Sequence, residues 1–162
     1  MSLLNRMSSR FRVDVIGKPS SEKEIEKLKV SSPIDVCEGY LSIVRKGADV
    51  EINVDEEMYI RFWDAESCIG MNEGYKIQEY IPNSLAIGDD EGGEAIIYAT
   101  GHKGFGLYIV GFGALDVDEC KYISRYLEDL LVNNKGIEVV KNPYEFYTFK
   151  GEFNENSIVK CN

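Results

Sequence analysis

The segment 81–98 constrains the fold most, because two apolar stretches in it flank a turn in which four carboxylates surround a pair of glycines. Glycine adopts positive φ angles that other residues resist, so Gly88, Gly92 and Gly93 are predicted to shape this turn. Pro82 is predicted to fix where the first strand can begin. The sequence therefore predicts two strands joined by a tight acidic turn.

The negative charge of the chain is concentrated in its middle third. The 162 residues carry a formal charge of −10, and residues 51–100 contain twelve acidic side chains against two basic ones. Residues 1–50 and 101–162 are close to balanced. An acidic field repels phosphate backbones and attracts basic partners, so direct binding of nucleic acid is disfavoured. A solubilising surface is the simpler interpretation of the same charge.

The cysteines predict neither a disulfide framework nor a metal site. Cys37, Cys68, Cys120 and Cys161 show no C-x-x-C pairing, and the first three lie in apolar patterns, as expected for reduced and mostly buried thiols. The first ten residues lack the apolar core of a signal peptide, and no apolar run approaches the roughly 20 residues of a membrane span. We expect a cytoplasmic protein with no membrane contact.

The first half of the chain predicts three strands and two helices up to Trp63. Residues 11–16 resemble a strand, and Ser21 with Glu24 forms a capping box for a short helix. Ser32 is predicted to cap a second helix that continues to residue 46, with Pro33 in its first turn. Residues 50–54 and 58–63 predict a hairpin, after which Asp64 is expected to cap a short helix through residue 71.

The second half predicts a central sheet and a long helix. Residues 85–88, 95–100 and 107–112 are expected to form strands, the last two joined by a glycine-flanked loop at residues 101–104. An apolar stripe predicts one helix from 117 to 131, and later strands are expected at 137–140 and 146–149.

Together these patterns predict one α+β domain over residues 1–162, in which helices pack around a mixed, largely antiparallel sheet. Its core is expected at about 11–150, with loose ends at 1–10 and 154–162.

Catalytic motifs are weak in this sequence. His102, the single histidine, lies in the glycine-flanked loop, and the chain has no G-x-S-x-G motif. That loop also lacks the spacing of a phosphate-binding loop. We therefore assign no catalytic residue, no metal ligand and no cofactor.

The acidic turn allows three interpretations. It could bind calcium or magnesium, although in an irregular geometry, because its acids are adjacent and do not alternate as in an EF-hand loop. Its carboxylates could serve a glycosidase, whose geometry a sequence does not reveal. Turn formation with solubilising acids is favoured over both.

Trp63 also allows two interpretations. It is more readily explained as half-buried core, although an aromatic residue at the rim of an acidic surface could anchor a partner.

The order of these motifs resembles the SUKH superfamily of Knr-like proteins over roughly residues 20–133. The matching positions are Trp63, Pro82, Gly88, Asp89, Gly92 and Gly93. The chain departs from the family pattern in an N-terminal extension and in a shortened segment before Trp63.

The resemblance implies an α+β fold and no catalytic residue. Bacterial members of this family look like cytoplasmic immunity proteins that bind and block a toxin domain, often a nuclease, and fungal members regulate cell-wall assembly and signalling. The leading hypothesis is therefore a non-enzymatic inhibitor of a basic toxin domain. We expect Asp89, Asp90, Glu91, Glu94 and Trp63 to contact that partner. An intracellular scaffold or signalling module is the second hypothesis, and a carboxylate-based or metal-dependent hydrolase is the third.

Overall fold

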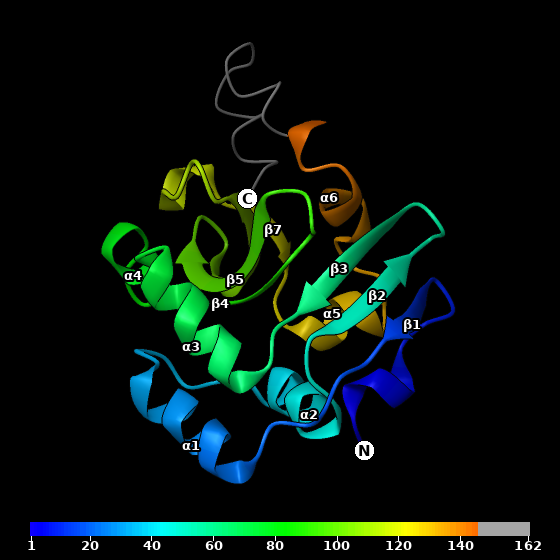
Figure 1. The fold of residues 1–162 in the computed structure, drawn as a ribbon. Coiled ribbons are helices and arrows are strands. Elements are labelled where there is room, and N and C mark those ends of the chain that lie inside the picture. The colour runs from blue at the N-terminus through cyan, green and yellow to red at the C-terminus, as the bar shows by residue number, and fades with distance from the viewer. Residues whose placement is uncertain (146–162) are drawn as a thin grey trace.

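Seven strands follow one another along the chain and pair in sequence order to form one sheet in the computed structural model (Figure 1). The structure describes residues 1–145. All pairings among these residues are antiparallel, so the α+β class is confirmed and the sheet is antiparallel instead of mixed. The strands are β1 (Phe11–Val15), β2 (Val50–Val54), β3 (Met58–Phe62), β4 (Leu85–Asp89), β5 (Glu94–Gly101), β6 (Gly104–Gly111) and β7 (Lys121–Ser124).

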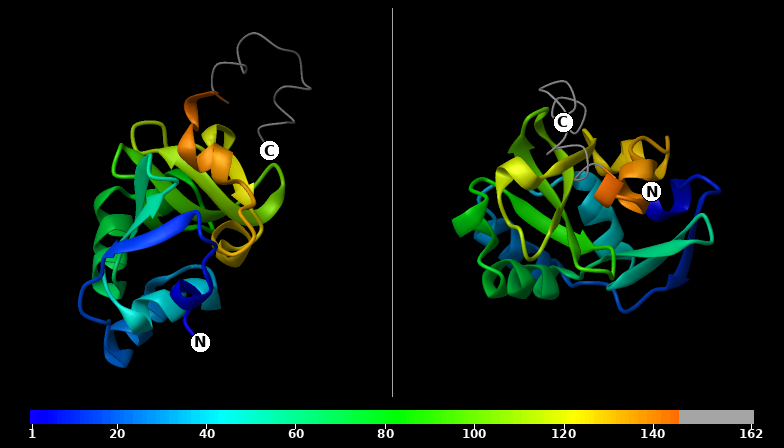
Figure 2. Two further views of the ribbon diagram at one scale, coloured as in Figure 1. Left: turned by 90° about the vertical axis from the view of Figure 1, so that its right-hand side faces the viewer. Right: turned by 90° about the horizontal axis from the view of Figure 1, so that it is seen from above.

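Helices gather in two groups beside this sheet. α1 packs against α3, and α5 and α6 contact β7. Figures 1 and 2 show β1 and the β2–β3 hairpin between α6 on one side and α1 and α2 on the other. The helices are α1 (Glu22–Ser31), α2 (Glu38–Lys46), α3 (Ala65–Gly74), α4 (Ile77–Tyr80), α5 (Leu127–Leu131) and α6 (Ile137–Lys141), with short 3-10 helices η1 (Leu3–Arg6) and η2 (Val117–Glu119).

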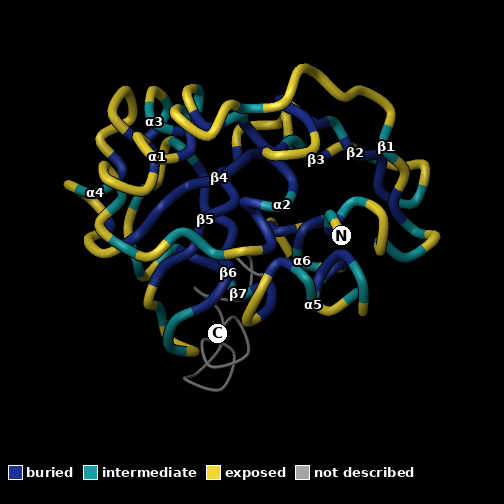
Figure 3. Tube along the Cα trace, turned by 90° about the horizontal axis from the view of Figure 1, so that it is seen from below, coloured by how far each residue is buried: buried dark blue, intermediate teal, exposed yellow. Residues whose placement is uncertain are grey.

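The β2–β3 hairpin has one core face and one outer face because side chains alternate along a strand. Ile52 pairs with Ile60 and both are buried in the core. Glu51 pairs with Arg61, and both lie on the outer face. By contrast, β4, β5 and β6 are buried along most of their length, as the dark tube in Figure 3 shows. The acidic turn between β4 and β5 is therefore mounted on the most buried part of the sheet.

The N-terminal ten residues are part of the fold, so the prediction of a loose end there was wrong. Residues 3–6 form η1, and Leu3 is buried in the core. Ser8 donates its backbone N–H to the carbonyl oxygen of Leu131 at 2.8 Å. Contacts with residues far along the chain order this segment, and its own sequence does not reveal them.

The second helix begins later than predicted. Ser21 caps α1 with a complete capping box, as expected, but Ser32 ends α1 instead of capping α2. Residues 33–37 form a connection without regular helix, and α2 begins at Glu38 after Cys37. The pattern at Ser32 and Pro33 fits a helix start locally, but these residues instead begin the connection between α1 and α2.

The long helix predicted over residues 117–131 was wrong. The segment forms η2, strand β7 and the short helix α5. β7 pairs with β6, where Tyr122 lies opposite Tyr108. Pairing with β7 satisfies the backbone groups along the edge of β6, which would lack these partners if residues 121–124 were helical. Apolar residues spaced three apart fit this strand and turn as well as they fit a helix.

Residues 137–140 belong to helix α6, so the prediction of a strand there was also wrong. Gly136 starts α6 at a φ of 78°, and an added Cβ would lie 2.1 Å from the carbonyl oxygen of Ile123. This close approach turns the chain back along β7. The strand predicted at 146–149 and the loose end predicted from 154 lie outside the described residues.

Candidate functional site

The acidic turn is held by its own aspartates. The Asp90 carboxylate accepts the N–H groups of Gly92 and Glu94 at 2.8 and 2.9 Å, and the Asp89 carboxylate accepts that of Glu91 at 2.9 Å. Two of the four acids that we expected at the surface therefore stabilise the turn through hydrogen bonds to its backbone.

The turn glycines act differently from one another. Gly93 has a φ of 99°, whereas Glu91, and not Gly92, takes the other positive φ of the turn. Gly88 lies within β4, where an added Cβ would lie 2.1 Å from the carbonyl oxygen of Arg61. The prediction of positive φ holds for Gly93 and was wrong for Gly88 and Gly92. Pro82 is exposed in the bend before β4, and β4 begins at Leu85 as predicted.

Asp89 and Trp63 form a buried pair. We had expected both to contact a partner, and for Asp89 and Trp63 that prediction was wrong. Asp89 is 4% exposed and Trp63 is 3% exposed. One Asp89 oxygen accepts the indole N–H of Trp63 at 2.9 Å and an N–H of Arg61 at 3.0 Å. The core interpretation of Trp63 is confirmed. Its indole N–H needs an acceptor when buried, and the motif acid supplies one.

Glu94 is also buried, contrary to our expectation that it faces a partner. Burial raises the pKa of Glu94, and the nearby Asp90 adds to the effect. The Tyr144 hydroxyl lies 3.3 Å from one carboxylate oxygen. Of the residues predicted to bind a partner, the structure leaves Asp90 half-buried and Glu91 exposed.

Glu91 faces a second carboxylate that the sequence did not single out. Although Glu91 as a whole is exposed, partial desolvation raises the pKa of its carboxyl group, and so does the neighbouring Glu51 on β2. A similar pair lies nearby, where burial and then the neighbouring Asp64 raise the pKa of Asp49. A carboxylate pair of this kind costs free energy when both groups are ionised. We call Asp49, Glu51, Asp64 and Glu91 the acidic face.

Two adjoining grooves are lined by three members of the acidic face, and Glu91 lies outside both. One, of about 340 Å³, is lined by Asp49, Glu51 and Arg61, and the other, of about 440 Å³, is lined by Asp49 and Asp64. The Arg61 guanidinium acts on both pairs, yet its short contact is to Asp89 at 3.0 Å. The only sequence signals for this face were the outward position of Glu51 in its strand and the acidic middle third.

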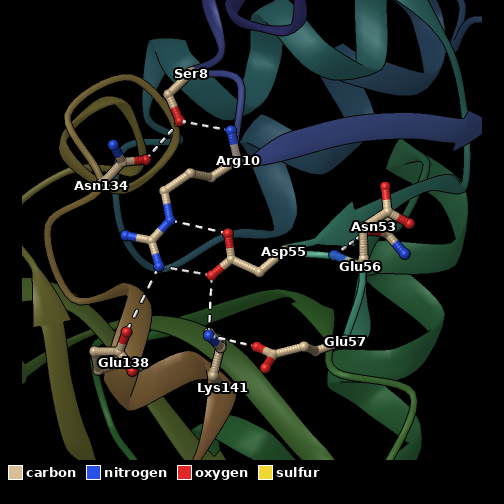
Figure 4. A network of polar contacts seen from close by, with 9 residues as sticks. All are labelled: Ser8, Arg10, Asn53, Asp55, Glu56, Glu57, Asn134, Glu138 and Lys141. Atoms are coloured by element: carbon tan, nitrogen blue, oxygen red, sulfur yellow. Dashed lines mark hydrogen bonds and ion pairs between the residues drawn. The ribbon is translucent and has the colours of Figure 1, made fainter.

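In a second charged cluster, unlike on the acidic face, the carboxylates form close ion pairs with cations (Figure 4). Arg10 donates two hydrogen bonds to Asp55, and Lys141 contacts both Asp55 and Glu57. The Arg10 and Lys141 contacts lower the pKa of Asp55, in the opposite direction from Asp49 and Glu91. This cluster joins the start of β1, the β2–β3 turn and α6. Its charges stabilise the fold, whereas those of the acidic face do not offset one another.

The described residues offer little for catalysis. His102 is partly exposed and lies 3.7 Å from the exposed carboxylate of Asp118. Burial raises the pKa of the Cys68 and Cys120 thiols to about 12, which disfavours the reactive thiolate. Within residues 1–145, no group of three or more His, Cys, Asp or Glu side chains is placed to hold a metal ion.

Comparison with models of known families and with curated proteins finds no match for this chain. Over the described part of the chain, no helix has both the length and the apolar character that crossing a membrane requires.

Proposed function

We propose that this chain is a non-catalytic protein-binding domain that binds a basic protein through the acidic face. The observation that carries the proposal is the placement of Asp49, Glu51 and Asp64 on the walls of two adjoining grooves. Neighbouring carboxylates raise the pKa of Asp49, beside Asp64, and of Glu91, beside Glu51. A lysine or arginine side chain that entered between such a pair would relieve the repulsion. The relief of this carboxylate repulsion would then add to the free energy of binding.

Toxin neutralisation is the activity we propose within this class. A nuclease domain presents a basic cleft to nucleic acid, and an acidic protein can occupy such a cleft in place of phosphate. The charge of −10 and the resemblance to SUKH immunity proteins both favour this role. A cytoplasmic location is part of the same proposal, because the antidote has to meet the toxin where the toxin acts.

The direct experiment uses the basic toxin domain encoded beside the gene of this chain. We expect Glu51→Gln combined with Glu91→Gln to weaken binding about tenfold, with most of the loss in the association rate at low salt. The same variant is expected to be as stable as the native chain or slightly more stable, because it removes a repulsion. Titration calorimetry and thermal melting of the two proteins measure both effects.

The matched control is Glu26→Gln combined with Asp35→Asn, which removes the same charge from exposed positions on α1 and the following connection. We expect this control to bind like the native chain. Equal affinities for the control and the acidic-face variant would contradict the proposal. Binding that did not weaken with added salt would also contradict it.

The scaffold hypothesis predicts a different outcome. If the gene has no toxin gene beside it and the chain instead captures a resident cellular protein through the acidic face, the binding class stands and toxin neutralisation is wrong.

A further inference from the structure

A third groove, of about 740 Å³, lies between the α3–α4 junction and the segment that joins β6 to η2. Its walls come from residues 74–80 and 112–119, which are far apart in sequence. It is separate from the two grooves of the acidic face. Its lining residues that matter here are Tyr75, Lys76, Tyr80, Phe112, Leu115 and Asp116. We call it the aromatic groove.

The aromatic groove exposes two tyrosine rings, and that of Tyr75 packs on Phe112. Tyr80 is 57% exposed and Tyr75 is 44% exposed. The Tyr75 ring lies 4.3 Å from that of Phe112, which in turn lies 6.4 Å from the buried Trp63. Exposed aromatic side chains that are already ordered lose little conformational freedom on binding, which is typical of interface anchors.

The charge around the aromatic groove indicates the sign of its partner. Residues 74–80 carry one acid and one lysine, and residues 112–119 carry three acids and no basic residue. A basic partner complements these walls. A second copy of this chain carries the same charge of −10 and would be repelled.

The aromatic groove is joined to the proposed binding surface through Phe112 and the buried Trp63. Phe112 donates its backbone N–H to the carbonyl oxygen of Gly93 in the acidic turn at 2.9 Å. Trp63 lines the 340 Å³ groove of the acidic face and stacks on Phe112 from the other side. One partner could therefore cover both regions at once.

We propose that the aromatic groove holds an aliphatic or aromatic side chain of the basic partner, flanked in that partner by lysine or arginine. This inference rests on the proposed function and adds to it the apolar part of the recognition. The acidic face attracts the partner and the aromatic groove retains it. Loss of the apolar contact would then raise the dissociation rate and leave the salt dependence unchanged.

A defined probe tests the aromatic groove without knowledge of the natural partner. The probe is a pentapeptide of four lysines around a central phenylalanine, compared with the same peptide carrying a central alanine and with one carrying four glutamates around phenylalanine. In amide NMR spectra of the full chain, we expect the lysine–phenylalanine peptide to shift the signals of Tyr75, Tyr80 and Gly113. The alanine peptide should bind severalfold more weakly, and the glutamate peptide should not bind.

Two variants probe the groove from opposite walls. Tyr80→Ala removes an exposed ring, and Ala114→Arg adds bulk and positive charge at an exposed position. We expect both to abolish the preference for phenylalanine over alanine. Tyr126→Ala, which removes a 42% exposed ring outside the groove, should preserve that preference.

The outcomes separate this inference from the proposed function. If both lysine peptides bind equally and shift residues of the acidic face alone, the aromatic groove proposal is wrong and the acidic face stands. If neither lysine peptide binds, both proposals are contradicted. If Tyr80→Ala instead converts a dimer to a monomer in sedimentation, the occupant is a second copy and the proposal is overturned.

Discussion

Asp89 joins three parts of the molecule through one carboxylate. One oxygen accepts the backbone N–H of Glu91, and the other accepts donors from Trp63 and Arg61 on the neighbouring segment. A buried carboxylate is tolerated only when it is paired and hydrogen-bonded, and Asp89 meets both conditions. The acid of the Gly-Asp motif therefore has a structural function, and Glu91, two positions later, is the exposed acid of the turn.

Replacement of this carboxylate should destabilise the fold. We expect Asp89→Ala to lower the free energy of unfolding by about 3 kcal/mol, because it leaves the indole N–H of Trp63 and the Arg61 charge without their partner. Urea denaturation measures the change, and Glu91→Ala, at an exposed position in the same turn, is the control. A loss below about 1 kcal/mol would show that the buried pair does not stabilise the fold.

At the scale of elements, α3 is joined to β4 by the Asn72 side chain, whose amide forms hydrogen bonds with both backbone groups of one β4 residue. Asn72 donates to the carbonyl oxygen of Ala86 at 2.8 Å and accepts the Ala86 N–H at 3.0 Å. Gln78 donates to the same Asn72 oxygen at 2.9 Å. β3 and β4 pair only at Arg61–Asp89 and Phe62–Gly88. The Asn72 amide thus satisfies backbone groups of β4 beyond the last strand pair.

Loss of the Asn72 donor should loosen this junction. In Asn72→Asp the new carboxylate cannot donate to Ala86, so we expect a loss of about 2 kcal/mol in the free energy of unfolding. Hydrogen exchange should show faster exchange at Ala86, with less change in β6. Asn83→Asp, at an exposed position before β4, makes the same chemical change and should have little effect. Equal effects of the two variants would contradict the role of Asn72.

The elements that the sequence predicted well are those whose signals are local. The capping box at Ser21, the hairpin of β2 and β3 and the turn at Gly93 each depend on neighbouring residues, and the structure has all three. β7 could not be predicted in this way, because its strand conformation depends on the open edge of β6. The like-charge pair of Glu51 and Glu91 was missed for the same reason, since forty residues separate its members.

At the scale of the whole molecule, the ion-paired cluster at Asp55 links distant parts of the chain. It joins Arg10, near the N-terminus, to α6, where Lys141 lies 86 positions from Asp55 in the sequence. The turn that carries Asp55 takes positive φ angles at both Asp55 and Glu56, which most residues disfavour. Ion pairs from Arg10 and Lys141 offset this cost. On the acidic face the carboxylates outnumber the cations, because Arg61 makes its short contact with Asp89 and Lys18 alone adds a positive charge to the 440 Å³ groove.

The cluster predicts how the fold responds to acid. The pKa of Asp55 in the folded chain lies below its ordinary value of 3.8, chiefly because Arg10 and then Lys141 donate to it. Its ionised form therefore favours folding, so the stabilisation is complete above about pH 4 and is lost as the pH falls through the folded-state pKa. We expect the urea midpoint of Asp55→Asn to fall less than that of the native chain between about pH 5 and pH 2. Asparagine tolerates the positive φ of this turn, so the variant tests charge alone. Asp35→Asn, at an exposed position, should follow the native curve, and an Asp55→Asn curve parallel to the native one would refute the assignment.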